Sequence, residues 1–350
     1  MLKRRAIDPT LAAGLVLAVV FIAVAIVYPL VKILGVAASG EAIPYFDRFL
    51  FRPTFQTIIA RTIVLGVTVG VAGTLIGFIW AFVQVRVAAP AWLKRALHII
   101  ALIPSVSPPF AVAISMIVLF GRRGMISYGI FGITGDVYGL NGMTIVMAMS
   151  FFPVVYLTLV GLMRGLDPAM EEASANLGGS KLRTFIRVTL PMLAPGIASS
   201  FLLLFVEAIA DLGNPLTIGG DYVVLSARLF IAINGEYDLM AGAVLAVILI
   251  VPSLGVYLVQ KYFADRASVI SITGKPTGSI TLVTDPRVRI PLLVINGILA
   301  GFIALVYLTM LAGAFTRLLG IDNSFTLNNF NYVLSGLGSE AMLDLSLIHI

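Results

Sequence analysis

The chain of 350 residues contains no cysteine and only two histidines. Without cysteine, disulfide bridges and metal sites built on thiolates are excluded. Charged residues are also scarce: they make up 11% of the chain, whereas a soluble domain carries about 25%. Hydrophobic residues make up 59%, and the mean hydropathy is +1.05. This composition predicts an all-α, polytopic membrane protein, because helices pair their own backbone groups inside lipid.

Motifs of several enzyme classes are missing as well. No G-x-x-x-x-G-K-[ST] loop is present, since Gly274-Lys275 lacks the earlier glycine and is followed by Pro276. We find no nucleophile–base set and no H-E-x-x-H zinc motif. The formal charge of +6 comes from segments between apolar runs, which fits the positive-inside rule better than nucleic-acid binding. We therefore predict neither an enzyme, nor a resident metal site, nor a nucleic-acid partner.

Seven apolar runs have about the 20 residues that a helix needs to cross a bilayer. The first follows Lys3-Arg4-Arg5 and has 24 residues, longer than the apolar core of a signal peptide, so we interpret it as a retained span. The predicted spans are 11–34, 62–84, 97–120, 143–163, 196–212, 239–260 and 290–313.

The basic residues predict the orientation. With the N-terminus in the cytoplasm, segments 1–10, 85–96, 164–195 and 261–289 are cytoplasmic and hold 15 of the 23 Lys and Arg residues. The pair Arg122-Arg123 is the main exception. On the outer side these two arginines are candidates for contact with an acidic partner protein, or for an ordinary solvated loop.

A polar segment of about thirty residues, 167–195, separates the fourth and fifth runs. Asp167 and Pro168 predict a helix start, Gly178-Gly179 predicts its end, and Ser180 is a candidate cap for a second helix. Two faces are expected from the helical period. They are Met170, Ala173, Ser174 and Leu177 on the first helix, and Leu182, Phe185, Ile186 and Thr189 on the second. Pro191 and Pro195 are expected to break the chain before the fifth span.

Within this segment Glu172-Ala173-Ser174, Gly178 and Val188-Thr189-Leu190-Pro191 fall at fixed spacing. The spacing resembles the EAA loop of ABC-importer permeases, with Ser174 in place of an alanine and Val188 in place of an isoleucine. The resemblance implies a cytoplasmic helix that enters a groove on an ATPase. An amphipathic hairpin on the membrane surface is the alternative. The implied ATPase-coupling residues are Glu171, Glu172, Ala173, Ser174, Gly178, Val188, Leu190 and Pro191.

Other stretches resemble the ferric-iron branch of these permeases: 103–110, 119–124, 210–215 and 273–276. The resemblance implies a permease subunit in the bacterial inner membrane, with two ATPase subunits and a periplasmic solute-binding protein as partners. It implies no cofactor on this chain, because the partner ATPase binds ATP and Mg²⁺. Permeases for thiamine, polyamines, sulfate and phosphonates are similar, so these substrates stay open. An ion-coupled secondary transporter and a membrane scaffold without transport are the rival functions.

In that branch two six-span units are joined in one chain, and this sequence predicts the same division. We expect a first permease unit over 1–263, a cytoplasmic linker over 264–289 rich in glycine and proline, and the start of a second unit over 290–344. The second unit is expected to be truncated. The last residues, 345–350, read LSLIHI, which is typical of a sequencing artefact.

Five residues are candidates for the transport pathway. Pro104, Pro108 and Pro109 interrupt the third span, and broken helices often line pathways, although a packing kink is equally expected. Glu207 and Asp211 lie four residues apart and are expected to share a face of the fifth span, with Glu207 near its middle. An ionisable group there tends to face a cavity. For Asp211 we expect a structural role.

Overall fold

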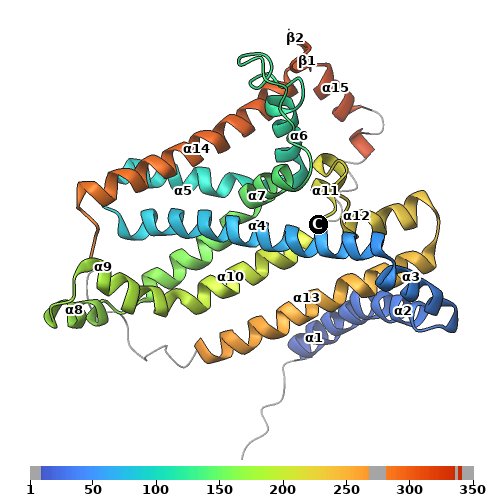
Figure 1. The fold of residues 1–350 in the computed structure, drawn as a ribbon, viewed down its shortest axis with the longest axis horizontal. Helices are drawn as coiled ribbons and strands as arrows, with labels where there is room; N and C mark the ends of the chain where they lie inside the picture. The colour runs from blue at the N-terminus through green and yellow to red at the C-terminus, as the bar shows by residue number, and fades with distance from the viewer. Residues whose placement is uncertain (1–8, 268–280, 336–337, 341–350) are drawn as a thin grey trace, which may run out of the picture. The chain divides into compact units, whose positions relative to one another are not determined.

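The computed structural model describes residues 9–267, 281–335 and 338–340, and Figure 1 shows them as a helical protein. The α-helices are α1 (Pro9–Ile22), α2 (Tyr28–Ala37), α3 (Ile43–Phe51), α4 (Pro53–Arg86), α5 (Ala91–Val106), α6 (Pro109–Phe120), α7 (Leu140–Gly165), α8 (Pro168–Asn176), α9 (Lys181–Thr184), α10 (Leu190–Ala210), α11 (Gly213–Ile218), α12 (Leu225–Phe230), α13 (Leu239–Ala267), α14 (Pro286–Ala314) and α15 (Asn328–Leu334). Two short strands, β1 (Thr316–Leu318) and β2 (Asp322–Phe325), form an antiparallel pair that the sequence did not predict.

The all-α membrane fold is confirmed. Among the described residues, six helices are long and apolar enough to cross a membrane: 12–37, 53–86, 140–165, 181–210, 239–262 and 286–314. A seventh candidate, α5 with α6, is bent by 104°. The bend falls at Ser107 and Pro108, whose backbone is extended. Proline disfavours helical geometry in the residue before it and cannot donate a helix hydrogen bond, so the chain turns here.

The predicted break before the fifth span is wrong. A continuous helical run extends from Lys181 to Ala210, with Pro191 in the first turn of α10 and Pro195 inside it. The run includes a π-helical turn, Phe185–Thr189, closed by a bond from Leu190 N to Phe185 O. Such turns accommodate irregular hydrogen bonding directly before a proline. The sequence rule failed because proline is tolerated within membrane helices.

The chain divides into two compact units. Unit 1 comprises Met1–Ala60 and Val224–Gly255, and unit 2 comprises Arg61–Val223 and Val256–Ile350. In unit 1 most side chains of α1 and α2 are apolar and exposed, as expected of a helix that faces lipid or another helix. A cluster of rings closes the other end of this unit, where Phe49 of α3 meets Phe55 edge to face at 4.6 Å.

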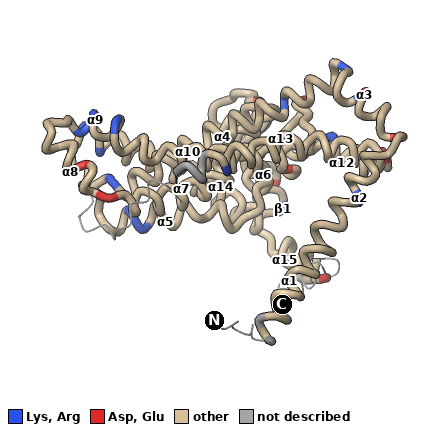
Figure 2. The backbone as a smooth tube through the Cα atoms, turned by 90° about the horizontal axis from the view of Figure 1, so that it is seen from below, with Lys and Arg blue, Asp and Glu red and all other residues tan. Residues whose placement is uncertain are grey.

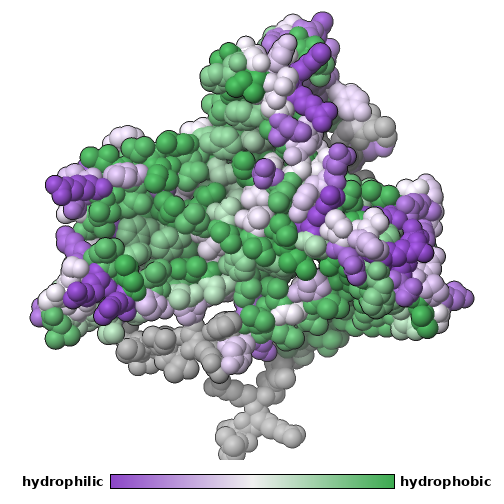
Figure 3. All heavy atoms as spheres, in the orientation of Figure 1, coloured by the Kyte–Doolittle hydropathy of each residue, from purple (hydrophilic) through white to green (hydrophobic). Residues whose placement is uncertain are grey.

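The core of unit 2 is formed where α4 packs on α7 and α10. The glycines of α4 let these helices approach closely: a Cβ at Gly73 would lie 2.3 Å from Leu204 of α10, and one at Gly77 would lie 2.6 Å from Val155 of α7. In Figure 1 these helices run towards the end of the unit that carries α8 and α9. Figure 3 shows a broad hydrophobic surface over the helices and hydrophilic residues at that end.

The predicted linker, 264–289, overlaps the helices on both sides, and its role as a linker stays a prediction. Helix α13 continues to Ala267, and α14 begins at Pro286, capped by Asp285, whose side chain accepts a hydrogen bond from Arg287 N. Between them Val283 forms a parallel bridge with Val87, directly after α4. Part of the linker, 268–280, and the suspected artefact, 345–350, lie outside the described residues.

Candidate functional site

The segment that resembles an EAA loop forms a helical hairpin. We use the name α8–α9 hairpin for residues 167–189. Asp167 caps α8 by accepting a hydrogen bond from Ala169 N at 3.0 Å, and Ser180 caps α9 by accepting one from Arg183 N at 3.3 Å. Both caps were predicted from the sequence, and each is worth about 1 kcal/mol because it satisfies an otherwise unpaired amide. The segment therefore specifies its own helix starts.

The turn between the two helices depends on two consecutive glycines. Gly178 has a φ of +80°, a conformation that a side chain disfavours. At Gly179 a Cβ would lie 2.7 Å from the carbonyl oxygen of Ser174, with which the Gly179 amide forms a 2.9 Å hydrogen bond. Thus Gly178 permits the backbone turn and Gly179 permits its close packing.

A buried ion pair ties the hairpin to α4. Arg86, the last residue of α4, donates from Nη1 to Oε2 of Glu171 at 2.8 Å, and the two side chains are 7% and 17% exposed. The other carboxylate oxygen, Oε1, accepts a hydrogen bond from Thr189 at 2.8 Å. Glu171 therefore joins three elements: α8, the end of α4 and the π-helical turn. Arg86 was not predicted as the partner of Glu171, because 85 residues separate the two and no local spacing predicts the contact.

The inner face of the hairpin is held by a hydrogen bond and a ring contact. Ser174 and Thr184 share a 2.8 Å hydrogen bond between the helices, and Phe185 packs edge-on against Phe82 of α4, with 5.5 Å between the ring centroids. Of the predicted common face, Leu182, Phe185 and Thr189 line one groove beside α4, whereas Ile186 does not line it and is exposed. Ile186 lies within the π-helical turn, which changes the residue period in this stretch.

The outer face of the hairpin is exposed and carries apolar side chains. Leu177 at the tip is 89% exposed, and Leu182 on the second helix is 67% exposed. Glu172 and Ala173 are exposed beside them. Figure 2 shows blue segments gathered around this end of the unit. The basic residues of these elements are Arg86, Lys94, Arg95, Arg164, Lys181, Arg183 and Arg187.

The end of the predicted motif lies on the second helix. Val188 and Leu190 are half-buried, and Pro191 is exposed in the first turn of α10. The eight predicted coupling residues thus lie on one hairpin and the helix that follows it. Their role in docking stays a prediction.

A groove of about 710 Å³ separates the hairpin from α4 and from the start of α14. Aromatic rings of Phe78, Phe82 and Phe185 line its apolar side, while Arg86 and Glu171 lie at its polar side. The hairpin is therefore supported on α4 through a few specific contacts, and it does not pack over its whole length.

The pathway candidates fall in two places. Pro104 is buried within α5, Pro108 precedes α6 and Pro109 begins it, so the predicted interruption of the helix lies at 107–108. The hydroxyls of Ser107 and Tyr307 form a hydrogen bond between this break and α14. These contacts give the break a packing role, and its place in a pathway stays a prediction.

The two carboxylates lie one helical turn apart, as predicted: the amide of Asp211, directly after α10, donates to the carbonyl of Glu207 at 3.0 Å. Helix α10 ends at Ala210, and Asp211 is extended; its Oδ2 accepts hydrogen bonds from Asn214 N and Nδ2 at 2.9 and 3.0 Å. Burial raises the pKa of Asp211, and these two hydrogen bonds oppose that rise. Glu207 is half-buried three residues before α10 ends, nearer the end of this helix than predicted, and its depth in the membrane stays a prediction.

One histidine, to which the sequence analysis gave no role, has a specific contact. Nδ1 of His98 lies 2.5 Å from the hydroxyl of Tyr156, which is fully buried on α7. Among the described residues, no group of three or more His, Asp or Glu side chains is arranged to hold a metal ion.

Curated relatives of similar sequence are transport proteins. The chain is 29% identical over 315 residues to the ferric transport system permease protein FbpB of Actinobacillus pleuropneumoniae, and the match covers 87% of this chain and 45% of that protein. It is 27% identical to a putative ferric transport system permease protein FbpB 1 of Haemophilus influenzae, over 92% of this chain and 52% of that protein. The chain thus spans about half the length of these two relatives.

A molybdenum transport system permease protein ModB of Escherichia coli is 28% identical over 53% of this chain and 82% of its own length. Among solved structures, a chain of a bacterial alginate ABC transporter in complex with an alginate pentasaccharide-bound periplasmic protein has a similar fold. Its TM-score is 0.63 at 14% identity, over 76% of this chain and 96% of that chain.

A family model described as the inner membrane component of binding-protein-dependent transport systems matches residues 73–269. The matched region includes α7, the α8–α9 hairpin, α10 and all of α13. It covers more than half of the chain, so this chain belongs to the family of binding-protein-dependent transport system inner membrane components.

Proposed function

We propose that this chain is the transmembrane permease subunit of an ATP-driven ABC importer. The observation that carries the proposal is the α8–α9 hairpin, whose apolar tip is exposed while its inner side is fixed to α4 by the buried pair of Arg86 and Glu171. A helix that presents exposed apolar side chains on a rigid support is suited to a groove on a partner. The family membership supports the same role.

The hairpin is also connected to three spans, so a movement of the hairpin would move them. It directly follows α7, continues into α10, and contacts the end of α4 through Glu171. We infer that two ATPase subunits bind the coupling hairpins of the importer and move them when ATP is bound. ATP and Mg²⁺ are held by those subunits, and this chain carries no catalytic group. Because each state of the spans has a different affinity for its partners, ATP binding biases the equilibrium between them.

The proposed substrate is ferric iron delivered by a periplasmic binding protein. Support comes from the two ferric permeases, which match 87% and 92% of this chain, whereas the molybdenum permease matches 53%. The N-terminus is placed in the cytoplasm, and the membrane is the bacterial inner membrane. The basic residues around the hairpin support this orientation, since Lys and Arg gather on the cytoplasmic side.

The test is uptake by the intact importer in proteoliposomes, with its ATPase inside and its solute-binding protein outside. We expect uptake of radioactive ⁵⁵Fe³⁺ that needs both ATP and the binding protein. Uptake of molybdate or sulfate and not of iron would contradict the substrate, while the permease function would stand. Uptake that follows an ion gradient without ATP would contradict the importer itself.

A further inference from the structure

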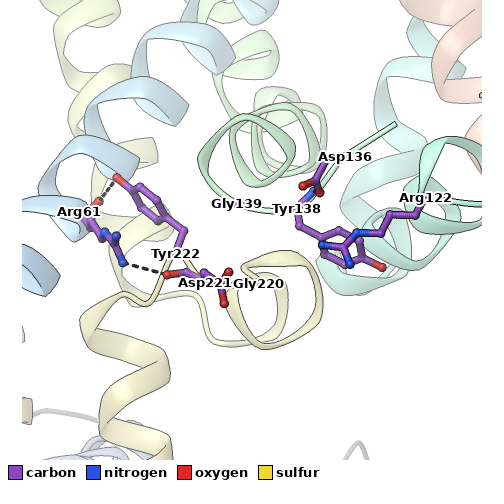
Figure 4. A pocket seen from close by; sticks show the side chains of 8 residues that line it. All are labelled: Arg61, Arg122, Asp136, Tyr138, Gly139, Gly220, Asp221 and Tyr222. Carbon is purple, nitrogen blue, oxygen red and sulfur yellow. Dashed lines mark hydrogen bonds between the residues drawn. The ribbon is translucent and has the colours of Figure 1, made fainter. Parts of the chain in front are cut away.

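A pocket with four charged residues in its lining lies at the end of unit 2 opposite the α8–α9 hairpin. Its volume is about 520 Å³, and Figure 4 shows the eight residues that line it. Helix α7 connects the two places: Gly139 of the pocket caps its N-terminus, and the hairpin follows its C-terminus. Its 26 residues span about 39 Å at 1.5 Å per residue. The pocket therefore lies at the outer end in the orientation proposed above.

Four charged side chains surround this pocket: Arg61, Arg122, Asp136 and Asp221. None of them forms an ion pair with any part of the chain that the structure describes. Arg61 donates one hydrogen bond, from Nη1 to the backbone oxygen of Asp221 at 2.9 Å. Two guanidinium groups and two carboxylates thus keep hydrogen-bonding capacity towards the pocket.

Each arginine lies against a tyrosine ring. The guanidinium of Arg61 is 5.0 Å from the ring centroid of Tyr222, and that of Arg122 is 5.8 Å from the ring of Tyr138. In Figure 4 these two pairs lie on opposite sides of the pocket. Arginine and tyrosine are the residue types that carry most binding energy at protein interfaces, because they combine a flat apolar surface with hydrogen-bond donors.

The backbone of the pocket is fixed before any partner arrives. The amide of Gly139 donates to the carbonyl of Ile218 at 3.0 Å, which joins the segment before α7 to the end of α11. Gly220 has a φ of +54°, and a Cβ there would lie 3.1 Å from Cβ of Tyr138. A preformed surface loses little conformational entropy on binding.

The residue types of the pocket favour a protein over a small solute. Pockets for small molecules are lined predominantly by hydrophobic and aromatic side chains with few charged groups, whereas four of the eight lining residues here are charged and the others are two tyrosines and two glycines. The charges balance, so the pocket attracts neither anions nor cations as a class. Charges of both signs instead match a surface that presents the complementary pattern, which gives an interface its specificity and its association rate.

We propose that this pocket is a docking point for the periplasmic solute-binding protein, which forms ion pairs with Arg61, Arg122, Asp136 and Asp221. The inference rests on the proposed function, because it takes its partner from the importer. Beyond the proposed function, the inference names the residues that bind the partner. It also names the surface that they recognise, which carries both carboxylate groups and ammonium or guanidinium groups.

The experiment measures the affinity of the labelled cognate binding protein for the intact importer in nanodiscs. The main variant is Arg122→Glu, and the matched control is Arg123→Glu, which changes the same charge at an exposed neighbour outside the pocket lining. We expect Arg122→Glu to weaken binding about 10-fold or more, because an attraction becomes a repulsion. The affinity of Arg123→Glu for the binding protein is expected to stay within about 2-fold of wild type. High salt is expected to reduce the difference in affinity between Arg122→Glu and wild type, because it screens the charges.

A second variant and a further measurement distinguish weaker binding from misfolding. Asp221→Lys reverses the opposite charge and is expected to weaken binding as well, while both variants keep the wild-type midpoint of thermal unfolding. Unchanged affinity in both variants would overturn the inference. So would a loss of uptake at unchanged affinity, since the pocket would then act on the solute. A wild-type importer that binds no solute-binding protein would instead overturn the proposed function itself.

Discussion

The two ends of unit 2 use charged residues in opposite ways. At the hairpin end, Arg86 is buried and paired with Glu171 at 2.8 Å, so the charges hold parts of this chain together. At the other end, Arg61, Arg122, Asp136 and Asp221 surround a pocket without forming ion pairs among themselves. Charges that are paired internally fix a structure, whereas charges left free on a rigid surface are available to a partner. Helices α4 and α7 join the two ends.

We expect the largest effect on uptake and stability from Arg86→Glu. The substitution places two carboxylates where one buried pair was, and breaking such a pair costs about 3–5 kcal/mol. We expect loss of ATP-dependent uptake and a lower midpoint of thermal unfolding in detergent. Arg95→Glu, an exposed residue near the start of α5, is the control and is expected to change neither.

The swapped pair, Arg86→Glu with Glu171→Arg, sharpens this prediction. It restores one ion pair but loses the hydrogen bond from Thr189, because an arginine at position 171 cannot accept it. We expect partial recovery of uptake compared with Arg86→Glu alone. If the swapped variant recovers no uptake, the ion pair itself is not what uptake needs, and each residue is needed for another reason.

Gly178→Val is expected to have the next largest effect. Its φ of +80° costs a β-branched residue about 1–3 kcal/mol, which we expect to distort the hairpin tip while leaving membrane insertion intact. Uptake is expected to fall below a tenth of the wild-type rate. Gly161→Val, on α7 with no atom within 4 Å of the added Cβ, is the matched control, and equal losses in both variants would contradict the argument.

A third change tests the outer face of the hairpin. Leu177 is exposed, so Leu177→Asp is expected to leave the free energy of unfolding within about 0.5 kcal/mol of wild type. Binding of the ATPase is expected to weaken about 10-fold, because a charged group enters an apolar contact. The measurement is co-purification of the ATPase at a series of concentrations, and unchanged binding would argue for the membrane-surface hairpin.

The smallest effect on stability is expected at the opposite end. Asp221 forms no ion pair within the described chain, so Asp221→Asn is expected to change the free energy of unfolding by less than about 0.5 kcal/mol. The midpoint of thermal unfolding checks this. A large destabilisation would show that the pocket charges hold the chain together, and the contrast between the two ends would then fail.

Local signals were sufficient for much of this structure. The caps at Asp167 and Ser180 and the glycine turn at Gly178 follow from residue types that satisfy or permit a particular backbone conformation. The spans follow from hydrophobic length. These features depend on neighbours in the sequence, so the sequence predicted them.

The errors came from interactions that local rules do not contain. Pro191 and Pro195 did not break the helix, because a π-helical turn precedes them and a membrane helix tolerates proline. Ile186, within the same turn, is exposed and does not line the groove that Leu182, Phe185 and Thr189 line. The partner of Glu171 and the pocket around Arg61 each join residues far apart in the chain, which no spacing in the sequence predicts.

The most direct test of the coupling hairpin uses the absence of native cysteine. Leu177→Cys, labelled with a benzophenone maleimide, places a photo-crosslinker at the tip of the hairpin. Ile133→Cys, labelled in the same way, places one at another exposed residue, which lies three residues before Asp136 of the pocket in the sequence. In an active, reconstituted importer we predict that the probe at 177 crosslinks the ATPase and the probe at 133 does not. An importer that stays active while the probe at 177 captures no ATPase, or captures it no better than the probe at 133, would contradict the account.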